Sequence, residues 1–344
     1  MANQRIPSLD GLRAISILMV ITGHIAQNNG LWHPLTSLAT AGVNVFFVIS
    51  GFLITTLLLR EQEQSQMISL KNFYVRRTLR IFPLAYAYIG CVLLLNRMGQ
   101  IPLLGDIPLN GGDAFYASTY LMAYHQTHAS WPLAHMWSLS LEEQFYLLWP
   151  LALVLVRNHA CYIAMVICVA MPLIRTALWF QYHDRPDVMN LLLPHSVDAI
   201  ALGCCAAYFP ETASKIGRRV PTWAILLLPL CAWAILAFPS EELPNMLRKI
   251  YRFSQDSACQ ISIVVMLVGA TSMDLKSPAG MLLNSRAMIL IGVLSYSLYI
   301  WQELFLMNLS IPVFYGIPLT CLCAWAGHQW IENPFLRLKD RFHR

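Results

Sequence analysis

Long apolar runs, separated by short clusters of charged residues, make up most of the chain. Each run has about 16 to 21 residues, the length that an α-helix needs to cross roughly 30 Å of hydrocarbon. The runs predict ten membrane helices, at residues 12–29, 39–59, 81–96, 138–156, 160–180, 190–209, 222–238, 257–273, 287–307 and 311–331. We therefore expect an all-α, polytopic membrane helix bundle that forms a single integral-membrane domain over residues 1–344.

The composition agrees with this pattern. Hydrophobic residues make up 57% of the 344 residues and charged residues 12%, against about 25% charged residues in ordinary soluble domains. These values exclude a soluble domain, a coiled coil and a disordered chain. The nine cysteines lie in or beside the apolar runs and include no CxxC pair. We expect them to be core residues, with neither disulfides nor a metal site.

The basic residues predict the orientation, because cytoplasmic segments of membrane proteins are enriched in Lys and Arg. With a cytoplasmic N-terminus, six of the 23 basic residues fall outside or within a span: Arg97, Arg175, Arg185, Arg248, Lys249 and Arg252. Both termini are therefore expected in the cytoplasm. Since the basic residues are not gathered on one soluble segment, we expect a lipid bilayer and no nucleic acid as partner.

The loop between Arg97 and Trp137 is expected on the outer side and contains one short apolar stretch, Ala114 to Ala123. Ten residues in a helix span about half a bilayer. This stretch therefore predicts a re-entrant or surface helix rather than an eleventh crossing.

Several ionisable residues fall inside the predicted spans: His24, Glu142, Glu143, Arg175, His195, Asp198, Glu303 and His328. A charge in a span costs at least about 2.5 to 3.5 kcal/mol on insertion scales, so such residues pair with one another or line a polar cavity. Both explanations stay open for any single residue. For the set, we expect a hydrated cavity that is open toward the outside.

Arg13 and His24 lie 11 residues apart in the first run. Eleven residues make three helical turns plus about 20°, so both side chains share one face, separated by about 16 Å. Histidine is the usual general base for a hydroxyl. The alternative is a buried neutral histidine that is bonded to a neighbouring helix.

The segment LKNFYVRRTLRIFP is basic and amphipathic, and it leads into the third run. Arg77 and Arg80 are three residues apart and therefore neighbours on one helical face. Arginine suits phosphate groups, so the cluster can hold a phosphorylated ligand or anionic lipid headgroups. Simple anchoring by the positive-inside rule is the alternative.

Seven motifs together give the sequence a family resemblance: SLDGLRAISILMVITGH, NVFFVISGFLI, FYVRRTLRIFP, HMWSLSLEEQFYLLWP, VDAIALG, LSYSLYIWQ and IENP. In this order, the chain resembles the acyltransferase 3 family of membrane O-acyltransferases, such as those that acetylate bacterial surface polysaccharides. The motif residues of the family match His24 and Glu142 as catalytic residues, and Arg13, Arg77 and Arg80 as residues that bind the donor.

The resemblance implies transfer of an acyl group, usually acetyl, from cytoplasmic acyl-CoA to a hydroxyl of a surface or periplasmic carbohydrate or lipid-linked glycan. It also implies the bacterial cytoplasmic (inner) membrane as the location. In the expected mechanism, His24 acts as general base or carries the acyl group transiently, and Glu142 orients or stabilises the imidazole. The extracytoplasmic esterase-like domain that is fused to some relatives is not expected here.

The sequence departs from the family pattern at two places. Gln302 stands where YxW is often followed by His, so no role of that His is carried over. His195 precedes VDAIALG where relatives commonly have Arg, which makes Asp198 a weak site candidate.

A secondary transporter or exporter of a glycan precursor or small metabolite is the rival function, because polar cavities in membrane bundles often carry substrates. It explains the ionisable residues in the spans. It does not explain why three cytoplasmic arginines lie below a histidine. The nature of the acyl group, acetyl, succinyl or another short acyl, stays open.

Overall fold

The computed structural model describes residues 6–31, 33–101, 104–125, 128–182, 196–239, 243–339 and 342. Within these ranges the chain is helical apart from loops and one isolated bridge between Ile101 and Gly105. Seven of the helices in the described part of the chain are long and apolar enough to cross a membrane: α1 (Leu9–Asn28), α2 (Ser37–Ser65), α3 (Leu70–Met98), α6 (Met136–Val156), α7 (Ala160–Tyr182), α12 (Asn245–Ser272) and α14 (Arg286–Leu306). α7 leaves Val166 and Val169 about two-thirds exposed, a surface that suits lipid. The chain is a multi-pass membrane protein.

The remaining predicted spans correspond to shorter helices of 12, 16 and 15 residues: α9 (Val197–Tyr208), α11 (Thr222–Ala237) and α15 (Val313–Gly327). α10 (Pro210–Gly217) meets α11 at a bend of 102°, and the pair makes an eighth crossing if counted as one span. Residues 190–195 of the sixth predicted span lie outside the described residues. The count of ten crossings and their orientation therefore remain predictions.

Two helices begin more than ten residues earlier than the hydropathy pattern predicts. α3 begins at Leu70 rather than at residue 81, with Ser69 as its cap, whose side chain accepts from the backbone N–H of Asn72 at 3.4 Å. α12 begins at Asn245 rather than at residue 257. In both cases the first turns are polar and basic. They are helical, but a pattern of apolar runs does not include them.

The chain forms two compact units. Unit 1 contains α1, most of α2, α7, α9 to α12, α13 (Pro278–Leu283) and the start of α14. Unit 2 contains the end of α2, α3, α4 (Asp113–Ser118), α5 (Trp131–Ala134), α6, the rest of α14, α15 and α16 (Asn333–Lys339). Each unit draws on three separate stretches of the chain.

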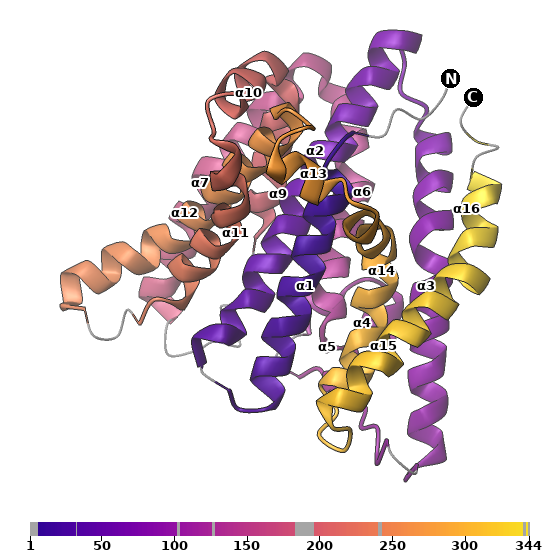
Figure 1. Cartoon of the computed structure of the whole chain (residues 1–344). Helices are drawn as coiled ribbons and strands as arrows, with labels where there is room; N and C mark the ends of the chain where they lie inside the picture. The colour runs from indigo at the N-terminus through magenta and orange to yellow at the C-terminus, as the bar shows by residue number, and fades with distance from the viewer. Residues whose placement is uncertain are drawn as a thin grey trace. The chain divides into compact units, whose positions relative to one another are not determined.

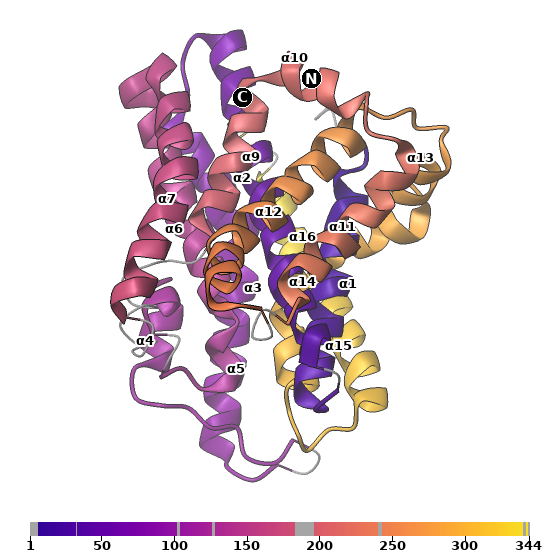
Figure 2. The ribbon, with the colours of Figure 1, turned by 90° about the vertical axis from the view of Figure 1, so that its left-hand side faces the viewer.

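Small residues bring the helices of unit 1 into close contact. α1 and α2 are joined by Ser16, whose hydroxyl donates to the carbonyl of Gly42 at 2.6 Å. α2 and α9 meet at two glycines, because a Cβ at Gly51 would overlap the carbonyl oxygen of Ile200 and a Cβ at Gly203 that of Val48. α11 and α12 lie side by side in the same unit (Figure 2). Such close approach of backbones is typical of membrane helix pairs.

The variant Gly203→Leu is expected to lower the free energy of unfolding by about 3 kcal/mol or more, since the side chain would drive α9 away from α2. Thermal unfolding in detergent measures the change. Gly90→Leu is the matched control, because no atom lies within 4 Å of a Cβ at Gly90. Equal stability of both variants would contradict this packing.

In unit 2, α16 runs alongside α3 (Figure 1). The expected re-entrant or surface helix at 114–123 consists of two short helical segments, α4 and a 3₁₀ turn at Met122–Tyr124. They dock on the long helices, because Tyr86 of α3 donates to the Ser118 carbonyl at 2.8 Å and Ser140 of α6 accepts from the Met122 N–H at 3.1 Å. Neither segment is long enough to cross a bilayer.

Candidate functional site

Arg13 and His24 belong to one continuous helix, α1. The spacing that places them on one face, about 16 Å apart, therefore holds in the structure. Arg13 pairs with Asp10 at 3.5 Å, and both side chains are largely buried. Asp10 did not emerge from the sequence as a partner, although the i,i+3 spacing could have indicated it.

Tight backbone packing fixes both ends of α1 within unit 1. A Cβ at Gly11 would overlap the Leu283 carbonyl, and one at Gly292 would overlap the Asp10 carbonyl. At the other end, Gly23 leaves no room for a side chain against Ala39 of α2. The half-buried His24 directly follows this contact, so α2 sets its position.

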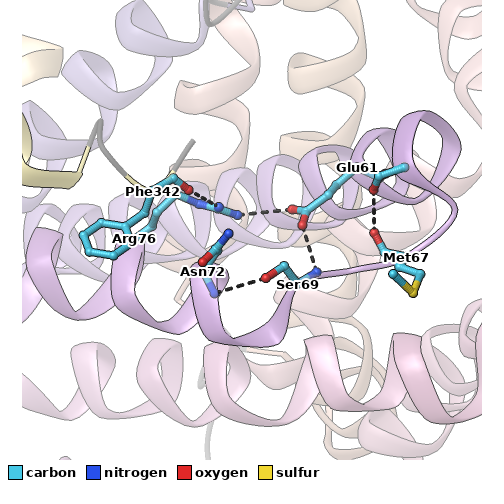
Figure 3. Close-up of polar contacts among 7 residues, drawn as sticks. Glu61, Met67, Ser69, Asn72, Arg76 and Phe342 are labelled. Carbon is cyan, nitrogen blue, oxygen red and sulfur yellow. Dashed lines mark hydrogen bonds and ion pairs between the residues drawn. The ribbon is translucent and has the colours of Figure 1, made fainter. Parts of the chain in front are cut away.

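The three arginines near the start of α3 have different surroundings. Arg76 binds Glu61 at 3.2 Å and the backbone carbonyl of Phe342 at 3.0 Å, so it connects the end of α2, the start of α3 and the C-terminal segment (Figure 3). Arg77 instead lies over the aromatic rings of Phe73 and Tyr146, at 5.6 and 5.4 Å from their centroids. Arg76 therefore holds neighbouring segments together. Arg77 faces α6, the helix that carries the motif HMWSLSLEEQFYLLWP.

Tyr146 connects Arg77 to the acidic pair of α6. Its hydroxyl lies 3.5 Å from a carboxylate oxygen of Glu142, and the charge of Arg77 also acts on Glu143. Arg80 lies one turn further along α3, where its charge acts on Tyr296 of α14. The structure thus brings Arg77 and Glu142 together in unit 2, with Arg80 nearby, whereas Arg13 and His24 belong to unit 1.

The tyrosines of LSYSLYIWQ connect the motifs of unit 2. Tyr296 donates to the Ile81 carbonyl at 2.6 Å, and Tyr299 donates to the His135 carbonyl and contacts the Ser138 hydroxyl, both at 2.7 Å. Ser297 bonds to Glu332 of IENP. The sequence did not identify these tyrosines as connecting residues, because it does not show which carbonyls they reach.

Three ionisable residues of unit 1 form a largely buried network. Arg175 binds Asp198 at 2.8 Å and Asp256 at 3.0 Å, and Gln260 donates to Asp198 at 3.0 Å. Asp198 is 1% exposed. For Arg175 and Asp198 the pairing explanation is therefore confirmed. His195, which precedes the motif, lies outside the described residues.

Three further ionisable or motif residues lie in unit 2 and have partners there. Gln302, the departure from the family pattern, donates to Glu303 at 3.0 Å, and both are buried. His328 lies 3.3 Å from Glu332 in the π-helical turn. Gln302, Glu303 and His328 therefore each pair with another polar residue of the bundle.

Comparison with known proteins gives one family. The model of the acyltransferase domain matches residues 6–332. The chain is 29% identical to the peptidoglycan O-acetyltransferase OatA of Listeria monocytogenes, 30% to a putative O-acetyltransferase of Staphylococcus aureus and 28% to the putative peptidoglycan O-acetyltransferase YrhL of Bacillus subtilis. Each match covers 96% of this chain and 54 to 57% of the relative.

The chain thus spans about half the length of these relatives. No solved structure matches it significantly. The family match extends across both units; it includes six of the seven motifs in full and ends within the seventh, IENP. The chain belongs to the acyltransferase 3 family.

Proposed function

We propose that the protein is a membrane O-acyltransferase that moves an acyl group from cytoplasmic acyl-CoA to a hydroxyl of a surface or periplasmic carbohydrate. Acetyl is the proposed acyl group. The family match over residues 6–332 carries this proposal. The names of the relatives support acetyl as the acyl group and peptidoglycan as the first acceptor to test.

The proposed setting is the bacterial cytoplasmic membrane, with ten crossings and both termini inside. One acyltransferase domain is proposed to comprise both units. The exposed apolar side chains of α7 support contact with lipid. The positive-inside distribution of Lys and Arg supports the orientation.

Arg13, Arg77 and Arg80 are the proposed ligands of the donor phosphates. Coenzyme A carries several phosphate charges, which arginine binds through in-plane N–H donors. The stacking of Arg77 on Tyr146 is compatible with this role, since guanidinium groups stack on aromatic rings while their edges bind anions. The separation of about 16 Å between Arg13 and His24 suits the extended pantetheine arm.

His24 is the proposed general base. As the acceptor oxygen attacks the thioester carbonyl, an imidazole nitrogen takes the hydroxyl proton. The carbon–sulfur bond then breaks, and the imidazolium returns the proton to the leaving thiolate, which gives the ester and free coenzyme A. Glu142 is proposed to stabilise the imidazolium. In the alternative route His24 first carries the acyl group itself.

Binding of acetyl-CoA tests the donor site directly. The double variant Arg77→Ala, Arg80→Ala is expected to weaken binding at least about 100-fold, because each hydrogen bond to a charged group contributes roughly 1.5 to 3 kcal/mol. The rise in thermal stability with acetyl-CoA concentration measures the affinity.

The matched control is the double variant Lys71→Ala, Arg97→Ala, which removes two positive charges from exposed positions of the same helix. It is expected to bind within about twofold of the parent, a difference of less than 0.5 kcal/mol. Unchanged binding in the Arg77 and Arg80 variant would contradict the donor site. If acetyl-CoA does not bind the parent either, the transporter function gains support.

A further inference from the structure

Tyr120 occupies an unusual position in unit 2. It lies in the segment between α4 and the 3₁₀ turn, with φ 56°, in the left-handed region that bulky side chains rarely adopt. Its ring is 8% exposed and stacks on Phe82 with centroids 5.0 Å apart, and Tyr86 packs against it edge-on. Backbone strain of this kind tends to occur at functional sites.

The neighbouring helix α6 holds Tyr120 in this conformation. Gln144 donates to the carbonyl of Tyr120 at 3.1 Å, and Ser140 accepts from the N–H of Met122 at 3.1 Å. These bonds fix the backbone on both sides of the strained residue. They also bring the ring of Tyr120 to the turn of α6 that carries Glu143.

Two polar atoms at this place lack partners. Among the described residues, neither the hydroxyl of Tyr120 nor one carboxylate oxygen of Glu143 has a hydrogen bond, although both atoms are buried. The two side chains are close enough to interact electrostatically. Burial and then the charge of Glu143 raise the pKa of Tyr120 above its ordinary value, so its hydroxyl remains a donor at neutral pH. Buried polar groups normally have partners, so the pair points to a ligand.

The hydrogen-bonding groups of Tyr120 and Glu143 indicate which kind of ligand fits between them. A phenol donates and a carboxylate accepts, and an alcohol satisfies both because it accepts and donates at the same oxygen. A fully ionised phosphate offers acceptors only, so it cannot donate to the unpartnered oxygen of Glu143. We propose that Tyr120 and Glu143 bind a hydroxyl of the carbohydrate acceptor, with the rings of Phe82 and Tyr86 beside the sugar. This inference rests on the proposed acyltransferase function.

Binding of a neutral oligosaccharide to the full chain in nanodiscs tests the proposal. The probe is chitotetraose, an uncharged oligomer of N-acetylglucosamine, and its affinity is measured by tryptophan fluorescence. Tyr120→Phe and Glu143→Met are each expected to weaken binding at least about tenfold, the effect of one lost hydrogen bond of about 1.4 kcal/mol. In the transfer assay, KM for the acceptor should rise more than kcat falls.

Tyr124→Phe is the control from the same segment, because the hydroxyl of Tyr124 already bonds to Gln144 at 3.2 Å. It should bind chitotetraose like the parent, and all variants should keep the parental affinity for acetyl-CoA. The proposal is overturned if the parent does not bind the probe, if Tyr120→Phe and Glu143→Met bind it normally, or if they lose acetyl-CoA equally. Normal sugar binding without acetyl transfer in the parent would instead contradict the proposed function.

Discussion

Replacing His24 by alanine is expected to lower acyl transfer by about 10²- to 10⁴-fold, the usual contribution of a positioned general base. α1 should keep its place in unit 1, because Gly11, Gly23 and Gly292 make its tight contacts through the backbone. The full chain in proteoliposomes, supplied with radiolabelled acetyl-CoA and purified peptidoglycan, gives the rate. The affinity for acetyl-CoA should change little, because no phosphate contact is removed.

His159→Ala is the control, since it removes an exposed histidine from the 3₁₀ turn before α7. It should transfer acetyl at the parental rate. A parental rate in the His24 variant would contradict both the direct route and the acyl-histidine route. A rate that falls together with the unfolding temperature would point to a structural role for His24.

Replacing Arg175 by methionine is expected to cost about 3 to 5 kcal/mol in the free energy of unfolding, the usual result of breaking a buried ion pair by removing one partner. The variant leaves Asp198 and Asp256 without the cation that binds both, at 2.8 and 3.0 Å. The loss should appear as a lower unfolding temperature in detergent.

The triple variant Arg175→Met, Asp198→Asn, Asp256→Asn should recover much of this loss, because no unpaired charge then remains in the network. Arg97→Met, at an exposed position of α3, should be as stable as the parent. If the single Arg175 variant is also as stable as the parent, the network does not stabilise unit 1. Failure of the triple variant to recover would show that packing, rather than charge, determines the loss.

The apolar runs predicted the membrane helices well where a run is long and its ends are charged, as in α1 and α7. Hydropathy reports lipid contact rather than helical conformation, so it missed the polar first turns of α3 and α12. It also joined α15 and the π-helical turn His328–Glu332 into one run, 311–331. The break at Tyr120 depends on bonds to α6, which no local pattern shows.

The sequence predicted which residues belong to the candidate site, but it did not predict most of the contacts between them. The family resemblance identified Arg77 and Glu142, but their connection through Tyr146 is tertiary. Asp256 was missed because it lies one residue before the predicted span at 257–273. The sequence named Glu143 only as one of several ionisable residues in the spans, and its association with Tyr120 depends on burial and missing partners, which are properties of the folded chain.

The discontinuous make-up of unit 1 has a consequence for membrane insertion. The packing partners of the start of α1, Leu283 and Gly292, are synthesised some 270 to 280 residues later, about 15 to 60 s at ordinary translation rates. Until then α1 must stay in the bilayer with Arg13 close to its start. The pair of Arg13 with Asp10 lies within a single helical turn, so the nascent helix neutralises its own charge before the rest of the unit exists.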